Sequence, residues 1–578
     1  MLKLQVIFRI FSVLMCLLAV NDVWAQAPEI IVSGADKELE TNIRQHLRIA
    51  DNEACDVPLV RLQRLRSQVE DNIRQAGEAL GYYRMSSELS FVVEKSCWQL
   101  TLDVTPGERI PVSKVSVRLP DDPALADTFG EIVDEAGALE GKPLDHGRYE
   151  SIKNALSASA VENGYFSAQF LESTISLDLA AYHAAIALDF DPGPRYRFGV
   201  IRVLPVDGFS QRFLDRLIIL QTGMPYSSSA LLEQRTKLDE SQYFRQVSIS
   251  PQLARADNLS VPVIIELGPR FRHAWSTGVG FTTDTGPRLR ASYDNRYINS
   301  RGHHLESDAS VSRVRSLVNL GYTIPLKDPL TTNVSLKTGY ISENTDVFDS
   351  DRYKLETAFN RESSSGWLES YSVDYLRDDY IIDQQADVST LTMLGYSLTK
   401  TAGDDFINPS RGWRLFGQLR GASGSLLSDT SFLQLYTSGK GVISFGKSRF
   451  ITRFEAGTTV IDNATELPAS VRFFAGGDRS LRGYDYKSLG PENDNGEVVG
   501  GKHLLVGSVE YDYLVKNNWR TAIFYDAGNA FSTHDFSWRH SVGIGFRWMS
   551  PIGPIRADLA HPLEGSGVRL HITMGPDL

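Results

Sequence analysis

The sequence has little cysteine and no apolar run long enough to cross a membrane as a helix. Only 3 of its 578 residues are cysteine, and its one notable apolar stretch, residues 10–20, lies close to the N-terminus. A spanning helix needs ~20 consecutive apolar residues, which excludes a helical membrane anchor. If the chain enters a membrane, it must form a closed barrel, because only helices and closed barrels satisfy their backbone hydrogen bonds in lipid.

Sequence signs of catalysis and of nucleic-acid binding are also missing. The chain contains no Gly-x-Ser-x-Gly, His-Glu-x-x-His or phosphate-binding loop, so we expect no enzyme and no cofactor. Its formal net charge of −12 argues against a nucleic-acid partner, which would need a basic surface. His303 and His304 could bind a metal, but they follow Gly302 in an expected turn, and we expect solvated side chains and no metal site there.

The N-terminus has the composition of a secretory signal. Lys3 and Arg9 supply a positive part, residues 10–20 supply an apolar part, and a cut is expected before Gln26. Residues 1–25 are therefore expected to be removed when the chain is exported.

Two cysteines, Cys55 and Cys97, remain after the signal, which contains the third. In an oxidising compartment they could form a disulfide. They could equally be two buried thiols, because the sequence does not fix their separation. Both interpretations remain open at this point.

Three markers recur in the same order along the first half of the chain, which indicates a threefold repeat. The aromatic markers are Gly81-Tyr82-Tyr83, Gly164-Tyr165-Phe166 and Gln242-Tyr243-Phe244, the closing markers are Pro106-Gly107, Pro192-Gly193-Pro194-Arg195 and Gly268-Pro269-Arg270, and Gly141-Lys142-Pro143-Leu144 recurs as Gly223-Met224-Pro225-Tyr226. The repeats predict domains at residues 27–106, 107–192 and 193–267, followed by a different region at 268–578.

The first repeat has the pattern of a small α+β domain. Apolar residues at positions 62, 65, 69, 73, 76 and 80 are spaced by three and four, which indicates a core-facing helix. Residues 29–32, 88–93 and 98–104 are typical of strands, so the unit is predicted to be strand, helix, helix, strand, strand. An edge of its sheet could bind another chain by strand addition, or could simply be covered.

From about residue 272 the helical stripes give way to alternation with a period of two. In residues 505–513 one face is apolar or glycine and the other includes Glu510 and Asp512, and four later segments repeat this alternation. A soluble sandwich would show the same pattern, but the expected export and the Tyr and Trp residues near strand ends favour a membrane barrel. About 310 residues, at roughly 19 per strand and turn, predict an antiparallel barrel of about 16 strands.

One charged segment, residues 471–486, interrupts this succession of strands. It contains three glycines and three arginines, which a membrane strand would not tolerate, so we expect it inside the polar lumen. Gly476 and Gly477 are expected to make the bend that sends it inward. Gly483 would allow close backbone approach, and the Tyr484 ring would pack on the wall while its hydroxyl finds a partner.

Arg482 carries a permanent charge and a planar set of donors, so inside a lumen it needs a carboxylate. Asp526 is the expected acceptor on an inward strand face, which Gly528 shares, and Glu510 is a plausible second acceptor on the preceding strand. The pair could be purely structural, or the loop could brace the strands opposite the seam, where the first and last strands of the barrel meet, while that seam opens. The two roles are compatible.

These segments resemble a known family. Leu481-Arg482-Gly483-Tyr484 resembles the loop motif, and Phe524-Tyr525-Asp526-Ala527-Gly528 the Phe-x-Asp-x-Gly strand motif, of an outer-membrane assembly superfamily that joins POTRA domains to a barrel. The three repeats resemble POTRA domains. The run of residues 473–484 is most similar to the TamA family of translocation and assembly module subunits, which is related to BamA. The resemblance covers the mature chain and implies that Arg482 lies against Asp526.

The resemblance also implies a location and partners. We expect a barrel in the cell outer membrane, with the POTRA domains in the periplasm and the first of them docking a TamB-like, inner-membrane-anchored protein. The barrel would help insert unfolded autotransporters or other β-barrel clients, and a TamB-like partner also raises a role in lipid passage. A two-partner-type secretion pore and a passive outer-membrane channel remain alternatives.

The seam of the barrel is the expected working part. The first strand, near residues 277–283, must pair with the last, near 568–574, and the chain then ends Met574-Gly-Pro-Asp-Leu578. Gly567 and the proline limit regular pairing there. A weak seam would leave strand edges with which an incoming membrane strand could pair.

Overall fold

The computed structural model describes residues 28–47, 55, 57–94, 97–405, 407–532, 536–550 and 553–575. The expected signal at residues 1–25 and the last three residues of the chain lie outside this described part. None of the described helices is long and apolar enough to cross a membrane.

The first domain is a three-stranded sheet covered by helices. In chain order its elements are β1 (Glu29–Ser33), α2 (Lys37–His46), α4 (Leu59–Arg64), α5 (Arg66–Ala79), β2 (Ser86–Glu94) and β3 (Cys97–Thr105). Strand β3 is central, parallel to β1 and antiparallel to β2. The expected apolar stripe packs on this sheet, with Leu62, Val69 and Ile73 buried in its core.

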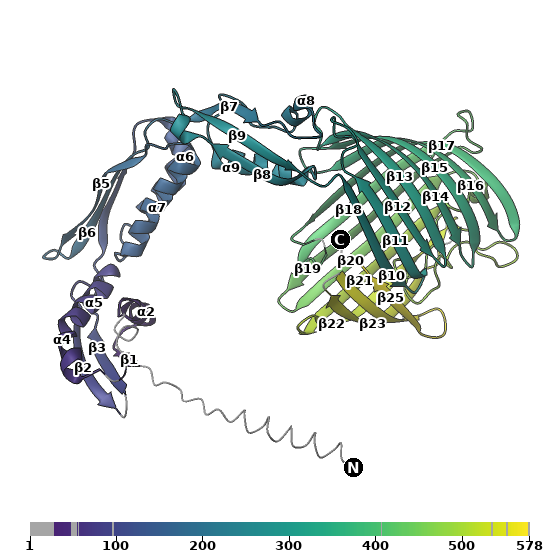
Figure 1. Cartoon of the computed structure of the whole chain (residues 1–578). Coiled ribbons are helices and arrows are strands. Elements are labelled where there is room, and N and C mark those ends of the chain that lie inside the picture. The colour runs from purple at the N-terminus through teal and green to yellow at the C-terminus, as the bar shows by residue number, and fades with distance from the viewer. Residues whose placement is uncertain are drawn as a thin grey trace, which may run out of the picture. The chain divides into compact units, whose positions relative to one another are not determined.

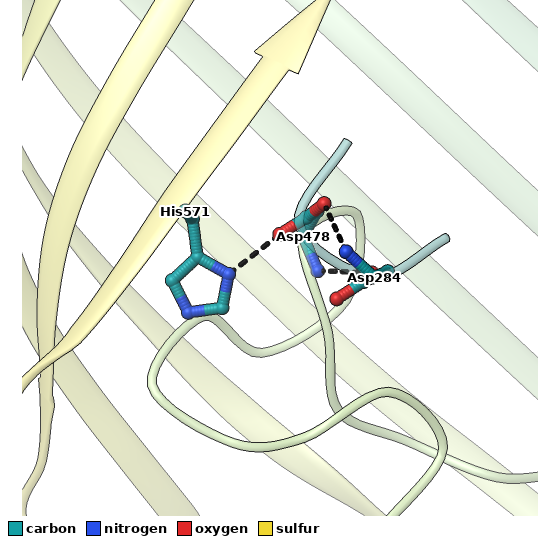
Figure 2. A group of neighbouring side chains, drawn as sticks. All are labelled: Asp284, Asp478 and His571. Carbon is teal, nitrogen blue, oxygen red and sulfur yellow. Dashed lines mark hydrogen bonds and ion pairs between the residues drawn. The ribbon is translucent and has the colours of Figure 1, made fainter. Parts of the chain in front are cut away.

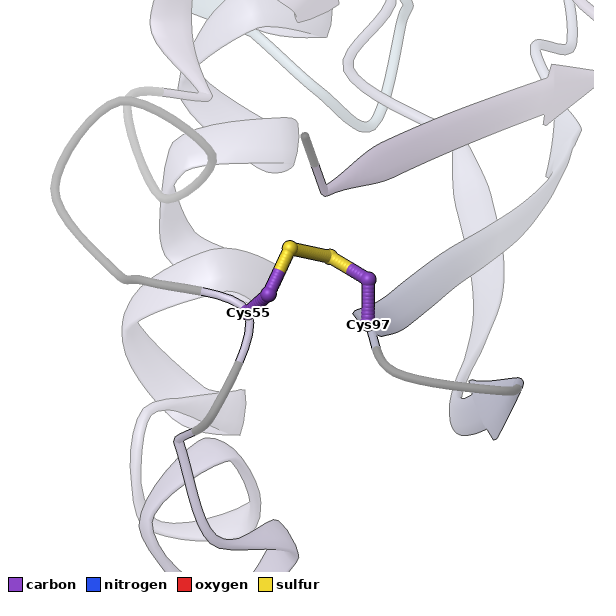
Figure 3. The surroundings of a disulfide bond; sticks show 2 residues. All are labelled: Cys55 and Cys97. Atoms are coloured by element: carbon purple, nitrogen blue, oxygen red, sulfur yellow. A yellow bond between two sulfur atoms is a disulfide. The ribbon is translucent and has the colours of Figure 1, made fainter. Parts of the chain in front are cut away.

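A disulfide joins Cys55, in the segment before α4, to Cys97, the first residue of β3 (Figure 3). Their Cα atoms lie 4.2 Å apart, although 42 positions separate them in the sequence. The bond fastens the helical side of the first domain to the start of its central strand.

Two further domains repeat the same topology. The second consists of β4 (Val112–Arg118), α6 (Pro123–Gly137), α7 (His146–Glu162), β5 (Gln169–Asp178) and β6 (His183–Asp191), and the third of β7 (Arg197–Val203), α8 (Gln211–Asp215), α9 (Ser228–Glu240), β8 (Phe244–Pro251), η1 (Leu253–Arg255) and β9 (Ser260–Pro269). Their strand orders, β4-β6-β5 and β7-β9-β8, match that of the first sheet. The predicted threefold strand, helix, helix, strand, strand architecture is therefore confirmed.

The repeated aromatic marker has a common backbone conformation. Gly81 and Gly164 follow helices with φ of 88° and 83°, and Gln242 holds the equivalent place with φ of 61°. This left-handed conformation ends each helix and suits glycine best, which explains why glycine begins two of the three markers.

The remaining chain forms a 16-stranded antiparallel sheet that curves into a barrel (Figure 1). Its strands are β10 (His273–Thr282), β11 (Gly286–Asn295), β12 (His304–Ser312), β13 (Arg315–Pro325), β14 (Thr332–Asn344), β15 (Phe348–Glu362), β16 (Leu368–Ile382), β17 (Gln385–Gly403), β18 (Arg411–Ala422), β19 (Phe432–Phe445), β20 (Ser448–Val460), β21 (His503–Lys516), β22 (Trp519–Phe531), β23 (Arg539–Ser550), β24 (Gly553–Pro562) and β25 (Arg569–Met574). The predicted strand number and antiparallel order are confirmed.

Side chains alternate between the two faces of the barrel wall as expected. In β21, Leu505, Val509 and Tyr513 are exposed on the outer face, whereas Glu510 and Asp512 are buried on the inner face. An apolar outer face suits lipid, and the charged inner face needs a polar lumen or internal partners.

The two ends of the strand order, β10 and β25, meet at a weakly paired seam (Figure 1). No ladder joins them among the described residues. The Thr283 amide donates to the Ile572 carbonyl oxygen at 3.1 Å, and the Ile572 amide donates to Thr283 Oγ1 at 2.6 Å. The first strand begins at His273, earlier than the sequence pattern predicted. The prediction placed the start too late because small residues interrupt the alternation of this strand.

Aromatic residues of the third domain pack against the first turn at one end of the barrel. The Tyr243 hydroxyl donates to the Gly302 carbonyl oxygen at 2.8 Å, and a Cβ on Gly302 would overlap the Phe213 ring. His303, expected in a solvated turn, instead lies with Nδ1 2.7 Å from the Tyr322 hydroxyl. This turn is therefore part of a packed junction rather than a free loop.

Candidate functional site in the barrel lumen

The candidate site is built on the segment between β20 and β21, residues 461–502, which we call the lumen loop. Arg472 stabilises its base by donating to three carbonyl oxygens: Leu467 at 2.7 Å, Thr465 at 2.8 Å and Val499 at 2.9 Å. The charged segment of residues 471–486 lies within this loop, and most of it is buried. The loop thus has an internal scaffold before it contacts the barrel wall.

Gly476 and Gly477 lie at a sharp bend of the lumen loop. Their φ angles are 102° and 104°, in the region that favours glycine. The Gly477 amide donates to the Leu481 carbonyl oxygen at 3.1 Å, which closes the turn. A side chain at Gly477 would lie 2.6 Å from the Asp284 carboxylate, so this turn and the β10–β11 turn approach each other closely.

Beyond the bend, Arg482 contacts the two carboxylates that sequence reasoning selected. Its Nε donates to Asp526 Oδ2 and its Nη2 to Asp526 Oδ1, both at 2.8 Å, and its backbone amide also donates to Asp526 Oδ2. Nη1 donates to Glu510 Oε2 at 2.8 Å. Asp526 is fully buried, with 0% of its surface exposed, so this carboxylate depends on its protein partners for solvation.

Three inward side chains that the sequence reasoning did not select complete the contacts. Arg482 Nη1 also lies 3.1 Å from Asp558 Oδ2, and Arg482 Nη2 donates to Ser508 Oγ at 3.2 Å. Arg547 donates to Glu510 Oε1 at 2.8 Å and also pairs with Asp558. Arg482, Arg547, Glu510, Asp526 and Asp558 together form what we call the charge network.

The Phe524 ring lies under the guanidinium of Arg482. The Cζ atom of Arg482 is 3.4 Å from the ring centroid, a stacked cation–π contact. Gly543 on the next strand makes room for this ring, because a Cβ there would overlap it. The Phe-x-Asp-x-Gly motif therefore supplies a stacking surface and a carboxylate to one arginine.

Gly528 was predicted to lie with Asp526 on the strand face that receives Arg482. Among the described residues it forms no hydrogen bond with Arg482. A Cβ on Gly528 would overlap the backbone of Leu505 and Val506 on β21. The glycine permits close approach of β21 and β22, and its role is in strand packing.

Gly483 and Tyr484 connect the lumen loop to the last strands. The Gly483 amide donates to His571 Nε2 at 2.8 Å, with φ of 94° at the glycine. The Tyr484 hydroxyl donates to Glu564 Oε2 at 2.8 Å, which gives it the polar partner expected from the sequence.

Asp284, Asp478 and His571 come together from the β10–β11 turn, the lumen loop and β25 (Figure 2). The amide of Asp478 donates to Asp284 Oδ2 at 2.7 Å, the amide of Asp284 donates to Asp478 Oδ2 at 3.2 Å, and His571 Nδ1 lies 2.6 Å from Asp478 Oδ1. Sequence reasoning missed all three residues. We call them the seam cluster.

The spacing of the seam cluster could hold a metal ion, since one ligand atom from each residue lies within 4.8 Å of the others. The hydrogen bonds argue against it. His571 Nε2 accepts from the Gly483 amide, so the proton of a neutral ring is on Nδ1, and Nδ1 donates it to Asp478. A ligating Nδ1 would force that proton onto Nε2, against the Gly483 N–H. The cluster is a hydrogen-bonded link.

The lumen loop is also attached to the opposite wall. Tyr486 donates its hydroxyl to Glu343 Oε1 at 3.1 Å, and Lys487 Nζ lies 2.7 Å from the same oxygen. Glu343, on β14, is also paired with Arg352 of β15 at 2.6 Å. The loop therefore spans the lumen from β14 to β24.

Comparison with known proteins is consistent with this arrangement of repeats, barrel and inward loop. A family model described as the Omp85 superfamily domain matches residues 262–568, more than half of the chain. The chain belongs to the Omp85 superfamily. A second model, described as POTRA domain TamA domain 1, matches residues 29–106 of this Omp85 protein.

Relatives of this Omp85 chain include two proteins named outer membrane protein assembly factor BamA. The one from Nitratidesulfovibrio vulgaris is 23% identical over 398 residues, covering 64% of this chain and 49% of the relative. The one from Neisseria meningitidis serogroup B is 22% identical over 492 residues, covering 72% and 61%. The chain thus matches about half to three fifths of the length of these relatives.

The Omp85 fold is also similar to a solved structure. The crystal structure of BamA from Haemophilus ducreyi lacking POTRA domains 1–3 aligns with a TM-score of 0.64 and 19% identity. The alignment covers 81% of this chain and 99% of that one. At this identity the likeness concerns the fold.

Proposed function

We propose that the chain is an outer-membrane insertase of the TamA type, which helps autotransporters and other β-barrel clients enter the membrane through its seam. The observation that carries the proposal is the seam itself. Strands β10 and β25 leave most of their facing edges without ladder hydrogen bonds in the described residues. Unpaired edges of this kind can bind an incoming strand by strand addition. The proposal assigns no enzymatic chemistry and no cofactor to the chain.

In this proposal the charge network braces strands on the β25 side of the seam, and not the strands opposite the seam as the sequence suggested. Arg482 contacts β21, β22 and β24 at once. Because separating buried charges is strongly unfavourable, these strands keep their positions relative to the loop when the seam opens. The loop would therefore act as an internal support rather than as a catalytic site.

The domains at residues 27–106, 107–192 and 193–267 are proposed to lie in the periplasm, ahead of the barrel at 268–578. The first would dock a TamB-like, inner-membrane-anchored partner. The match of residues 29–106 to a TamA-type POTRA model supports this choice. In the described part of the first sheet, β2 is an outer strand and one of its edges pairs with no other strand, which offers a surface for such a partner.

Reconstitution tests the proposal. Liposomes that contain the purified full chain should speed the membrane insertion of a urea-unfolded autotransporter barrel, compared with liposomes that contain the D526N variant or no protein. Equal insertion rates in all three would overturn the proposal. Planar-bilayer recordings separate the alternatives, because a passive channel would conduct steadily while a plugged barrel with an opening seam should conduct in irregular bursts.

A further inference from the structure

The lumen loop is attached to strands on both sides of the seam. The first and last strands, which meet at the seam, form few hydrogen bonds with each other. On the C-terminal side, the charge network attaches the loop to β21, β22 and β24 through buried groups. On the opposite wall, Tyr486 and Lys487 attach it to Glu343 of β14. The loop is thus fixed to both walls of the lumen, as far as β24, the neighbour of the last strand, on one side and at β14, the fifth strand of the barrel, on the other.

The last strand is bound to the same loop. His571 accepts from the Gly483 amide and donates to Asp478, and both groups are buried. Arg569, two residues earlier on the same face of β25, pairs with Asp485. Because that second pair is largely exposed, it contributes little, and His571 is the principal tie between β25 and the loop.

The first hairpin, β10–β11, has a different and smaller attachment. At its turn, the Asp284 carboxylate accepts from the Asp478 amide, and the Asp284 amide donates to the Asp478 carboxylate. Thr283 adds its few hydrogen bonds to Ile572. Among the hydrogen bonds of the described residues, these are the ones that must break for the hairpin to move away from β25, whereas moving β25 away from the loop would require breaking the bonds of His571 to Asp478 and Gly483.

We propose that the seam cluster is a latch, in which Asp478 holds the first hairpin, through Asp284, against the last strand, through His571. The seam opens when the β10–β11 hairpin releases Asp478, while the loop and β25 stay together. The latch rests on the seam opening that the proposed function requires, and it names the moving side. His571 acts by positioning Asp478 and Gly483.

Hydrogen exchange tests the latch in the full chain, reconstituted in liposomes without any client. The amides of Thr283 and Ile572 donate across the seam, so their protection reports its opening. We expect D284A to speed exchange at both by about tenfold, the factor for loss of one or two hydrogen bonds. D284N keeps an acceptor for the Asp478 amide and should stay within roughly twofold of the wild type. The Arg482 amide should be unchanged in both variants.

H571A is the second variant, and H561A is its matched control. His561 is an outward-facing, exposed histidine on β24 whose ring contacts the Gly567 carbonyl oxygen. H571A should speed exchange at Ile572 by about tenfold and H561A should not. Heat-modifiable gel mobility confirms that each variant contains a folded barrel.

Two results would overturn the latch: unchanged exchange at Thr283 and Ile572 in D284A, or equal acceleration at the Arg482 amide, which would mean that the loop leaves with the hairpin. Neither depends on client insertion. If the exchange results hold but no client is inserted, the proposed function fails and the latch stands.

Discussion

Arg482 lies directly over the ring of Phe524, with its Cζ atom 3.4 Å from the ring centroid. The same strand presents Asp526 to the edge of the guanidinium, so one face and one edge of the arginine are fixed by residues two positions apart. Residues i and i+2 of a strand share a face, which explains why the motif needs this spacing. The contact fixes the orientation of the lumen loop against β22.

Replacing Arg482 by lysine should destabilise or misassemble the barrel. Lysine keeps the charge but lacks the planar set of donors that reaches Asp526, Glu510 and Asp558 together. Breaking a buried ion pair costs about 3–5 kcal/mol. R482K should lose much of its heat-modifiable gel mobility, as should D526N.

R479K, at an exposed position of the same loop, is the control and should behave as the wild type. Normal mobility in R482K would contradict the importance of the network.

Replacing Gly543 by alanine should disturb the same site from the neighbouring strand. The new Cβ would overlap the Phe524 ring, which could then no longer lie under Arg482. Overpacking of this kind costs about 1–3 kcal/mol. The urea midpoint of the reconstituted barrel measures the loss. The control is G278A on β10, where a Cβ would meet no atom within 4 Å. Equal midpoints for G543A and G278A would count against the packing described here.

The latch should depend on pH through Asp284, which lies in the β10–β11 turn. Burial, and then the nearby charge of Asp478, raises the pKa of the Asp284 carboxyl to about 7. A carboxyl with a raised folded pKa contributes stability that is fully present below its ordinary pKa of about 4 and is lost progressively as the pH rises to the folded pKa of about 7. Asp478 and His571 face this group directly, and Arg288 and Arg479 line the same cavity.

Hydrogen-exchange protection of the Thr283 and Ile572 amides, corrected for the intrinsic pH dependence of exchange, should therefore fall in the wild type as the pH rises from about 4 to about 7, the interval between the ordinary and the raised pKa of this carboxyl. D284N cannot titrate there and should show a flatter profile. The same fall in D284N would assign the pH dependence to another group.

Removing the disulfide should weaken the first domain alone. Cross-linking residues 42 positions apart restricts the unfolded chain, an effect worth about 3–4 kcal/mol in the entropic account. The C55S/C97S double variant should lose hydrogen-exchange protection in β3 but keep it in the barrel strands. Reductant applied to the wild type should reproduce this result, and an unaltered first domain in both would show that the bond contributes little.

The sequence predicted the architecture and part of the lumenal site for identifiable reasons. Alternation places Glu510 and Asp526 on an inward face, and a buried arginine needs carboxylates, so Arg482 and these partners could be matched. Arg547, Asp558 and His571 also lie on inward faces. Their contacts depend on the register between strands, such as Gly545 opposite Asp558. Alternation excludes a slip of one residue but does not distinguish registers that differ by two.

Asp284 and Asp478 were beyond sequence reasoning for a different reason. Both lie in turns, where no periodicity shows the direction of a side chain. Their contact joins positions 194 residues apart, and it exists because the glycine bend at Gly476 and Gly477 brings the loop to the first hairpin. The disulfide likewise depended on a separation that only the folded domain provides.

We infer that the barrel works through an opening seam, and a covalent crosslink across that seam would keep it closed. Cysteines in place of Thr283 and Ile572, whose backbones are hydrogen-bonded across the seam, should form a disulfide that holds β10 against β25. Client insertion by T283C/I572C liposomes should stop when the bond is formed and return with reductant, while reductant leaves wild-type insertion unchanged. Full insertion by the crosslinked barrel would contradict this inference.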